Sequence, residues 1–150
     1  MKKVSIIDER GELAGVFRGV AQKDIGLSDV LNGYSKGRGI LQAIRVLSPQ
    51  FVICDELGNI EDIKSVEEGL NAGVKIIASI HASSIDELIN RKQVRLLLNT
   101  GAFDKIMLME QGPYFGQIKG IYKVGDLNVE DGRLNNADYN RKLGRTYSVE

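Results

Sequence analysis

Two adjacent carboxylates follow the most apolar short run of this chain. Residues 51–54 read Phe-Val-Ile-Cys, and Asp55 and Glu56 come directly after them. A strand that ends in Asp-Glu is the Walker B pattern, in which the Asp holds Mg²⁺ through water and the Glu polarises the water that attacks a nucleotide. The alternative is a strand-to-helix turn with two solvated carboxylates, where Asp55 or Asp62 helps to cap the next helix.

The only histidine of the chain, His81, ends a second apolar run over residues 75–81. A neutral imidazole there would face the same sheet edge as the two carboxylates, where it can contact a terminal phosphate or orient water. The alternative is a local role beside the next helix, with Ser83 or Ser84 as N-cap and Glu87 in the first turn.

A third acidic pair, Asp8 and Glu9, ends the first apolar run, and Gly11 turns the chain soon after. Acidic residues at the ends of successive strands would form one negative rim suited to a hydrated Mg²⁺. Solvated turn charges are the alternative.

Two further side chains have chemistry to consider. Arg45 lies on a predicted helix before Pro49, and an arginine there can reach the phosphate site of a neighbouring subunit or form an ordinary surface ion pair. Cys54 lies within the apolar run, where we expect a small buried hydrophobe. One His and one Cys are too few for a zinc site of the usual kind.

The elements that position these residues follow an alternating pattern. Short apolar runs alternate with stretches of helical period, which is typical of parallel strands joined by crossover helices, so the fold class is α/β. Ligands collect at the carboxyl ends of strands in such sheets. We expect strands that are buried on both faces over Val4–Asp8 and residues 51–55, 75–81 and 105–110.

Helical spacing connects these strands. It predicts helices around Ile40 to Leu47, around Ile63 to Leu70, and from Ile85 continuously towards Leu97, with Gly73 and Gly101 as C-caps. Residues 11–39 are expected to form a long irregular loop. Residues 118–124 alternate and predict an edge strand with one wet face. We expect one domain over residues 1–125 and a polar tail over residues 126–150.

Composition narrows the function classes. The chain has 150 residues, 43% of them apolar, which suits one globular domain with a core. Its 20 basic residues balance 20 acidic ones, so we expect no nucleic-acid partner. Asp8 comes too early for a signal peptide, and no apolar run is long enough to span a bilayer. We therefore expect a cytoplasmic protein with no direct membrane insertion.

The segments quoted above resemble a known family when they are taken together. Residues 4–15, 29–33, 44–49, 55–58 and 73–81 look like the ATPase domain of the stage III sporulation protein AA family, which is related to the type II and type IV secretion ATPases. The resemblance runs in unbroken order to Glu110. It implies a RecA-like, P-loop NTPase-type parallel sheet flanked by helices.

The resemblance also implies roles for the site residues. Asp55 and Glu56 would be the Walker B pair, with Asp55 as the water-mediated Mg²⁺ ligand. His81 would lie in the histidine box, and Asp8 and Glu9 in a segment like the aspartate box. The cofactors implied are Mg²⁺ and ATP.

Arg45 belongs, by the same resemblance, to the stretch leading into Walker B. The family is expected to form a homo-oligomeric ring, a hexamer, peripheral to the inner membrane at the cytoplasmic face of the sporulation channel complex. Its partners would be the proteins of that membrane complex.

One departure from the family pattern is large. Family members carry a Gly-rich Walker A loop ending in Gly-Lys-Thr or Gly-Lys-Ser upstream of the segment that matches Val4. Residues 33–39 have glycines and cations but lack that ending. We therefore expect a sheet that misses its P-loop strand and a chain that binds ATP poorly alone. Residues 105–110 would then either pair directly with residues 75–81 or leave a gap for another chain.

Three functions remain open. The first is the C-terminal part of a sporulation ATPase that would power or assemble a channel complex by Mg²⁺-dependent ATP hydrolysis and is inactive alone. The second is a non-catalytic scaffold or assembly subunit that uses a degenerate ATPase fold to bind a protein partner. The third, a flavodoxin-type small-molecule binder, lacks a recognisable phosphate loop.

Overall fold

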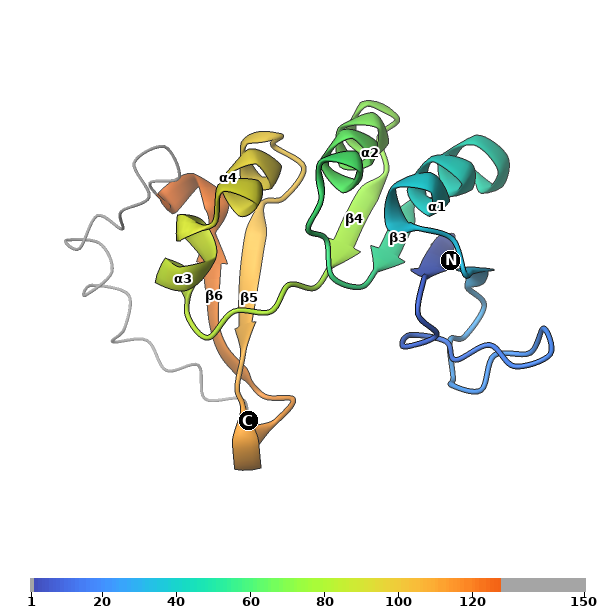
Figure 1. The fold of residues 1–150 in the computed structure, drawn as a ribbon, viewed down its shortest axis with the longest axis horizontal. Helices are drawn as coiled ribbons and strands as arrows, with labels where there is room; N and C mark the ends of the chain where they lie inside the picture. The colour runs from blue at the N-terminus through green and yellow to red at the C-terminus, as the bar shows by residue number, and fades with distance from the viewer. Residues whose placement is uncertain (1, 128–150) are drawn as a thin grey trace.

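The computed structural model describes residues 2–127, which form two sheets and the helices packed on them (Figure 1). A parallel sheet has the order β2-β1-β3-β4, and a two-stranded antiparallel sheet pairs β5 with β6. The α/β class and the parallel sheet are as expected. The strands are β1 Val4–Asp8, β2 Asp29–Asn32, β3 Phe51–Cys54, β4 Lys75–Ala78, β5 Lys105–Met109 and β6 Ile118–Lys123.

Helices α1 (Lys36–Gln42) and α2 (Ile60–Asn71) pack against each other on one face of the parallel sheet (Figure 1). Every second residue of each central strand points at them, and these side chains form the first core. That core is made of Ile7, Leu31, Ile40, Ala43, Val52, Cys54, Leu57, Val66, Val74, Ile76 and Leu97. The two helices therefore fix the strands that carry the acidic residues.

The opposite face of the parallel sheet becomes more open towards β4. Ile6, Ile53 and Ile77 are register partners across β1, β3 and β4, and they point away from the two helices. Ile6 is buried, Ile53 is half-buried, and Ile77 is 53% exposed. Parallel strands are usually covered on both faces, so β4 is unusual in this respect.

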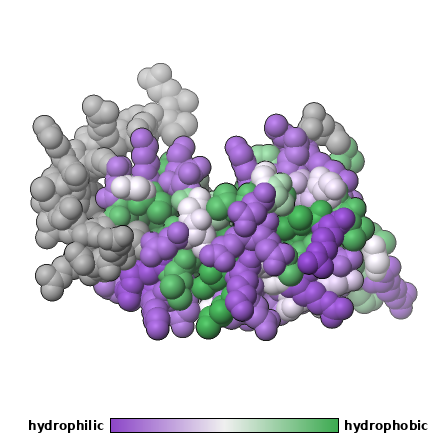
Figure 2. Space-filling model, turned by 90° about the horizontal axis from the view of Figure 1, so that it is seen from above, coloured by the Kyte–Doolittle hydropathy of each residue, from purple (hydrophilic) through white to green (hydrophobic). Residues whose placement is uncertain are grey.

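A second core joins the antiparallel sheet to α3 (Ile85–Asn90) and α4 (Lys92–Asn99). Ile106 and Leu108 of β5 point into it, and Leu127 is buried there. Leu97 of α4 packs in the first core, so α4 links the two parts. Seen from the helical side, hydrophilic side chains cover most of the surface, with apolar patches between them (Figure 2).

Several expectations about the elements are wrong. Residues 11–39 are not wholly irregular, because they contain β2 and the start of α1. The helix expected from Ile85 to Leu97 is divided at Arg91, which has extended backbone angles. In contrast, the helix expected around Ile40 to Leu47 is present, as α1 and a π-helical turn over Ala43–Leu47 that ends at Ser48, which has a left-handed backbone. The strand expected over residues 75–81 stops at Ala78.

The expected strand over residues 105–110 is also different. It pairs with β6 and does not pair with β4, so direct pairing with the histidine-bearing segment is wrong. Its burial alternates, with Met107 and Met109 exposed, because one face packs on α3 and α4 and the other does not. The strand predicted over residues 118–124 is present as β6.

The expected C-caps are confirmed, because Gly73 and Gly101 have positive φ angles of 74° and 75° after α2 and α4. In the parallel sheet, β1, β3 and β4 are contiguous. Among residues 2–127, no helix has the length and hydropathy needed to cross a bilayer. The predicted polar tail lies outside the described residues from position 128 onwards.

Gly39 sets how closely α1 approaches β1. A Cβ at this position would lie 2.4 Å from Cγ2 of Ile7, far inside contact distance. We expect Gly39→Ala to lower the free energy of unfolding by about 2 kcal/mol, because overpacking a tight core outweighs the better helix propensity of Ala. Urea unfolding measures the change. Gly58→Ala is the control, since its Cβ meets nothing within 4 Å; equal effects of the two substitutions would contradict this account.

Candidate functional site

The carboxyl ends of β1 and β3 bring two of the predicted acidic segments together. The two strands are parallel neighbours with Ile7 opposite Cys54, so the residues that follow them leave the same edge. Glu9 and Asp55 then meet at a third residue, Lys36. The Nζ of Lys36 lies 2.7 Å from Oε2 of Glu9 and 3.4 Å from Oδ1 of Asp55.

Lys36 reaches this edge because it is the first residue of α1. Glycines at positions 37 and 39 let the helix approach its neighbours closely: a Cβ at Gly37 would lie 3.2 Å from the carbonyl oxygen of Glu61. The Lys36 side chain is consequently only 8% exposed. Sequence reasoning missed this residue, since it considered residues 33–39 only as a possible phosphate loop. The one local hint was a lysine beside two glycines, at positions 37 and 39, which does not identify its partners.

The charges of this group do not cancel. Burial lowers the pKa of Lys36, but the hydrogen bond that its ammonium donates to Glu9 and the charges of Asp55 and Glu9 outweigh it, so the pKa lies above its ordinary value. Lys36 therefore stays charged between two carboxylates, and the group carries a net charge of about −1. Oδ1 of Asp55 is buried, and among residues 2–127 its close polar neighbour is the Lys36 ammonium, without good hydrogen-bond geometry.

Asp8, the last residue of β1, has a different environment from Glu9. Its side chain is fully buried, and its oxygens accept N–H groups of Leu13 at 3.1 Å, Ala14 at 2.8 Å and Gly15 at 3.1 Å. Burial raises the pKa of Asp8, but these backbone hydrogen bonds lower it below its ordinary value. The carboxylate thus holds the loop after β1, and both its oxygens are engaged there.

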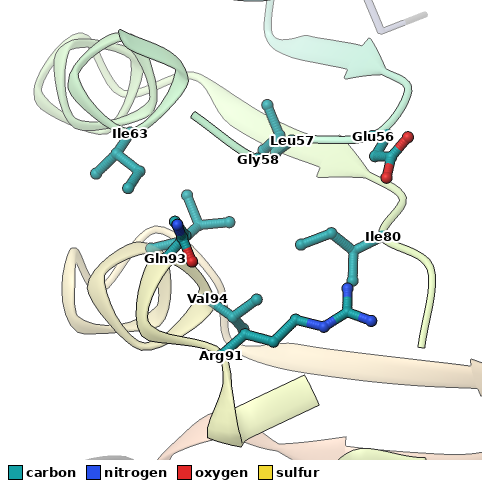
Figure 3. A pocket seen from close by; sticks show the side chains of 9 residues that line it. Glu56, Leu57, Gly58, Ile63, Ile80, Arg91, Gln93 and Val94 are labelled. Atoms are coloured by element: carbon teal, nitrogen blue, oxygen red, sulfur yellow. The ribbon is translucent and has the colours of Figure 1, made fainter. Parts of the chain in front are cut away.

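Glu56 lies beside a cavity of about 260 Å³ (Figure 3). Its lining is mostly apolar, and Glu56 and Arg91 supply the charged groups. The N–H of Leu57 donates to the carbonyl of Ser79 at 3.3 Å, which ties the loop after β3 to the loop after β4. Glu56 is half-buried and lies at the border of this cavity.

His81 and Arg45 are both exposed and lie outside the ion pairs of Lys36. His81 follows β4 by three residues, so its segment leaves the same sheet edge as Asp55. The next helix has the predicted cap, because the side chain of Ser84 accepts the N–H of Glu87 at 3.1 Å.

Cys54 is a buried hydrophobe, as expected, with 2% of its surface exposed. Burial and the neighbouring carboxylates raise its pKa to about 12, so it stays a thiol. Among residues 2–127, no group of three or more His, Cys, Asp or Glu side chains is arranged to hold a metal ion.

The donor atoms at Asp55 and Glu9 are of the type that Mg²⁺ prefers. The space between them, however, is taken by the Lys36 ammonium. Direct coordination of Mg²⁺ by both carboxylates does not fit this arrangement, whereas a water-mediated contact with Asp55 leaves the ion pairs in place.

The hydrogen bonds of Asp8 make its charge important for stability. We expect Asp8→Asn to lower the free energy of unfolding at pH 7 by about 2 kcal/mol, because hydrogen bonds to a charged acceptor are lost. A lowered folded-state pKa contributes stability above the unfolded value of about 4, and this contribution is lost as the pH falls towards the folded value. The difference between wild type and variant should therefore shrink below about pH 4.

Urea unfolding at neutral pH and at about pH 3 measures this difference. Asp29→Asn, at an exposed carboxylate on β2, is the matched control. A control effect as large as that of Asp8→Asn, or a difference that does not shrink in acid, would reject the role of Asp8.

Comparisons with known proteins bear on this site. The family model "Sporulation stage III, protein AA" matches residues 2–128. Stage III sporulation protein AA of Bacillus subtilis (strain 168) is 38% identical over 121 residues, which cover 80% of this chain and 39% of that protein. The chain thus spans well under half the length of this relative.

A solved structure is also similar. The X-ray structure of the Legionella pneumophila ATPase DotB aligns with a TM-score of 0.44 and 15% identity, covering 66% of this chain and 30% of that one. The family match over nearly all the described residues carries the assignment: this chain belongs to the sporulation stage III, protein AA family.

Proposed function

We propose that this chain contributes the Walker B edge of a Mg²⁺-dependent ATP-hydrolysing unit that works in sporulation. The observation that carries the proposal is the position of Asp55 and Glu56 at the carboxyl end of β3, a strand with neighbours on both sides. Glu56 lies beside a cavity and would polarise the attacking water. Asp55 would hold Mg²⁺ through water, and the ion would neutralise phosphate charge.

The phosphates of ATP would be held by a segment other than residues 2–127. The chain contains no Gly-Lys dipeptide, so it has no Walker A ending. The lysine of residues 33–39 is Lys36, whose ammonium is already paired with two carboxylates. We infer that this chain binds ATP weakly by itself.

The exposed positions of Arg45 and His81 support roles towards a ligand or a neighbouring subunit. We propose that the functional form is a homo-oligomeric ring, a hexamer by resemblance, in which these side chains complete the nucleotide site. The ring would act at the cytoplasmic face of a sporulation membrane complex and would power or assemble that complex.

A scaffold function is the second candidate, and exposed apolar side chains favour it. Ile77 on β4 and Met107 and Ile121 on the antiparallel sheet are each more than half exposed. Such side chains suit a protein partner. In that case the carboxylates would have no catalytic task.

Calorimetric titration with Mg²⁺-ATP tests whether the chain binds nucleotide by itself, which neither candidate function requires. We expect no binding tighter than about 1 mM, because no phosphate loop is present. Micromolar affinity would contradict the proposal that phosphate binding comes from elsewhere.

Catalysis is tested in a chimera of the Bacillus subtilis relative in which the matching segment is replaced by residues 2–127 of this chain. We expect the chimera to hydrolyse ATP and Glu56→Gln to lower turnover by about 100-fold or more, because the amide cannot accept the proton of water. Phosphate release measures the rate.

Glu67→Gln, at an exposed carboxylate on α2, is the control and should leave turnover unchanged. If the chimera is folded and Glu56→Gln hydrolyses ATP at the same rate as the parent, the catalytic role is rejected. A folded chimera with no turnover at all favours the scaffold.

A further inference from the structure

We infer that Lys36 is a tethered cation that occupies the direct coordination place between Glu9 and Asp55 and so keeps divalent ions in water-mediated contact with Asp55. The inference rests on the proposed function in one respect: Asp55 is the residue proposed to hold Mg²⁺. Lys36 is a positioning residue in this account and does not touch substrate.

The first step of the argument is the cost of burying a lysine. Lysine is almost never buried without a partner, since its ammonium loses its hydration. The Lys36 side chain is 8% exposed, and that of Asp55 is 9% exposed. Glu9 accepts one of the three ammonium N–H groups at 2.7 Å, and the ammonium also lies 3.4 Å from Asp55.

The second step is the position of the ammonium relative to both acids. The Lys36 ammonium lies between Glu9 and Asp55. A divalent ion at this point would have the strongest electrostatic attraction to both carboxylates. Within the described part of the chain, the buried Oδ1 of Asp55 accepts no hydrogen bond of good geometry and has the Lys36 charge within ion-pair distance. A metal ion could bind that oxygen directly only after the ammonium had left.

The third step is how firmly the ammonium is held. Gly37 and Gly39 seat the first turn of α1 against the α2 backbone and Ile7: a Cβ at Gly39 would clash with Ile7, and one at Gly37 would make a tight contact with α2. The Lys36 side chain therefore projects from a fixed helix end rather than from a free loop. The residual negative charge of the group attracts a hydrated cation, while the ammonium prevents its dehydration at this point.

The experiment uses the 150-residue chain without nucleotide and Mn²⁺ as the probe. Paramagnetic broadening of backbone amide signals near Glu9 and Asp55 locates the bound Mn²⁺, and the electron paramagnetic resonance signal of free Mn²⁺ gives the affinity. We expect Lys36→Met to bind Mn²⁺ about tenfold more tightly than wild type, because two carboxylates become free. Lys36→Arg keeps the charge and should show no gain.

The double variant Glu9→Gln/Lys36→Met tests whether the gain comes from this site, and it should lose the gain. Circular dichroism establishes that each variant is folded. Equal Mn²⁺ affinity of folded wild type and Lys36→Met would overturn the inference, and so would a gain that survives in the double variant.

A second experiment uses the wild-type chain, so it does not depend on whether a variant folds. The buried Lys36 ammonium should give a protected proton–nitrogen NMR signal that stays in place when Mg²⁺ is added. Loss or a large shift of that signal on addition of Mg²⁺ would mean that the ion displaces the lysine, which rejects the inference. Because no ATP is present, this failure is distinct from a failure of the hydrolysis test.

Discussion

The close approach of α1 to β1 is the constraint on which the rest of the site depends. Gly39 removes the side chain that would otherwise meet Ile7, and Gly37 does the same against the α2 backbone. The helix can then lie deep enough for Lys36, its first residue, to reach the ends of β1 and β3. Packing geometry therefore decides the electrostatics of the acidic edge.

That edge shows how similar sequence patterns acquire different chemistry. Asp8 and Asp55 both come at the end of an apolar strand, and both are buried. Backbone N–H groups of the following loop stabilise Asp8, whereas the ammonium of a distant helix stabilises Asp55. The carboxylate of Asp8 is engaged by its own loop and serves the fold, while that of Asp55 depends on a side chain from another element.

Sequence reasoning found the parts of the fold that have long or continuous signals. Apolar runs located β1, β3 and β4, and the Asp-Glu pair after β3 was found with them. β2 was missed because its four residues include only two apolar ones, Val30 and Leu31. The strand β5 was misjudged because Ile, Met and Leu in succession read as buried on both faces, whereas Met107 is exposed. Lys36 was missed because pairing across 27 residues leaves no local pattern.

The unpaired edge of β4 has a consequence for how the parallel sheet can bind other segments. Ile77 lies on the outermost strand of the order, and within residues 2–127 no strand pairs with the far side of β4. Main-chain groups along that border can bond to any extended segment, whatever its side chains. Within residues 2–127, β4 therefore presents an unpaired row of backbone N–H and C=O groups beside the exposed Ile77, and a strand from another segment would extend the sheet there.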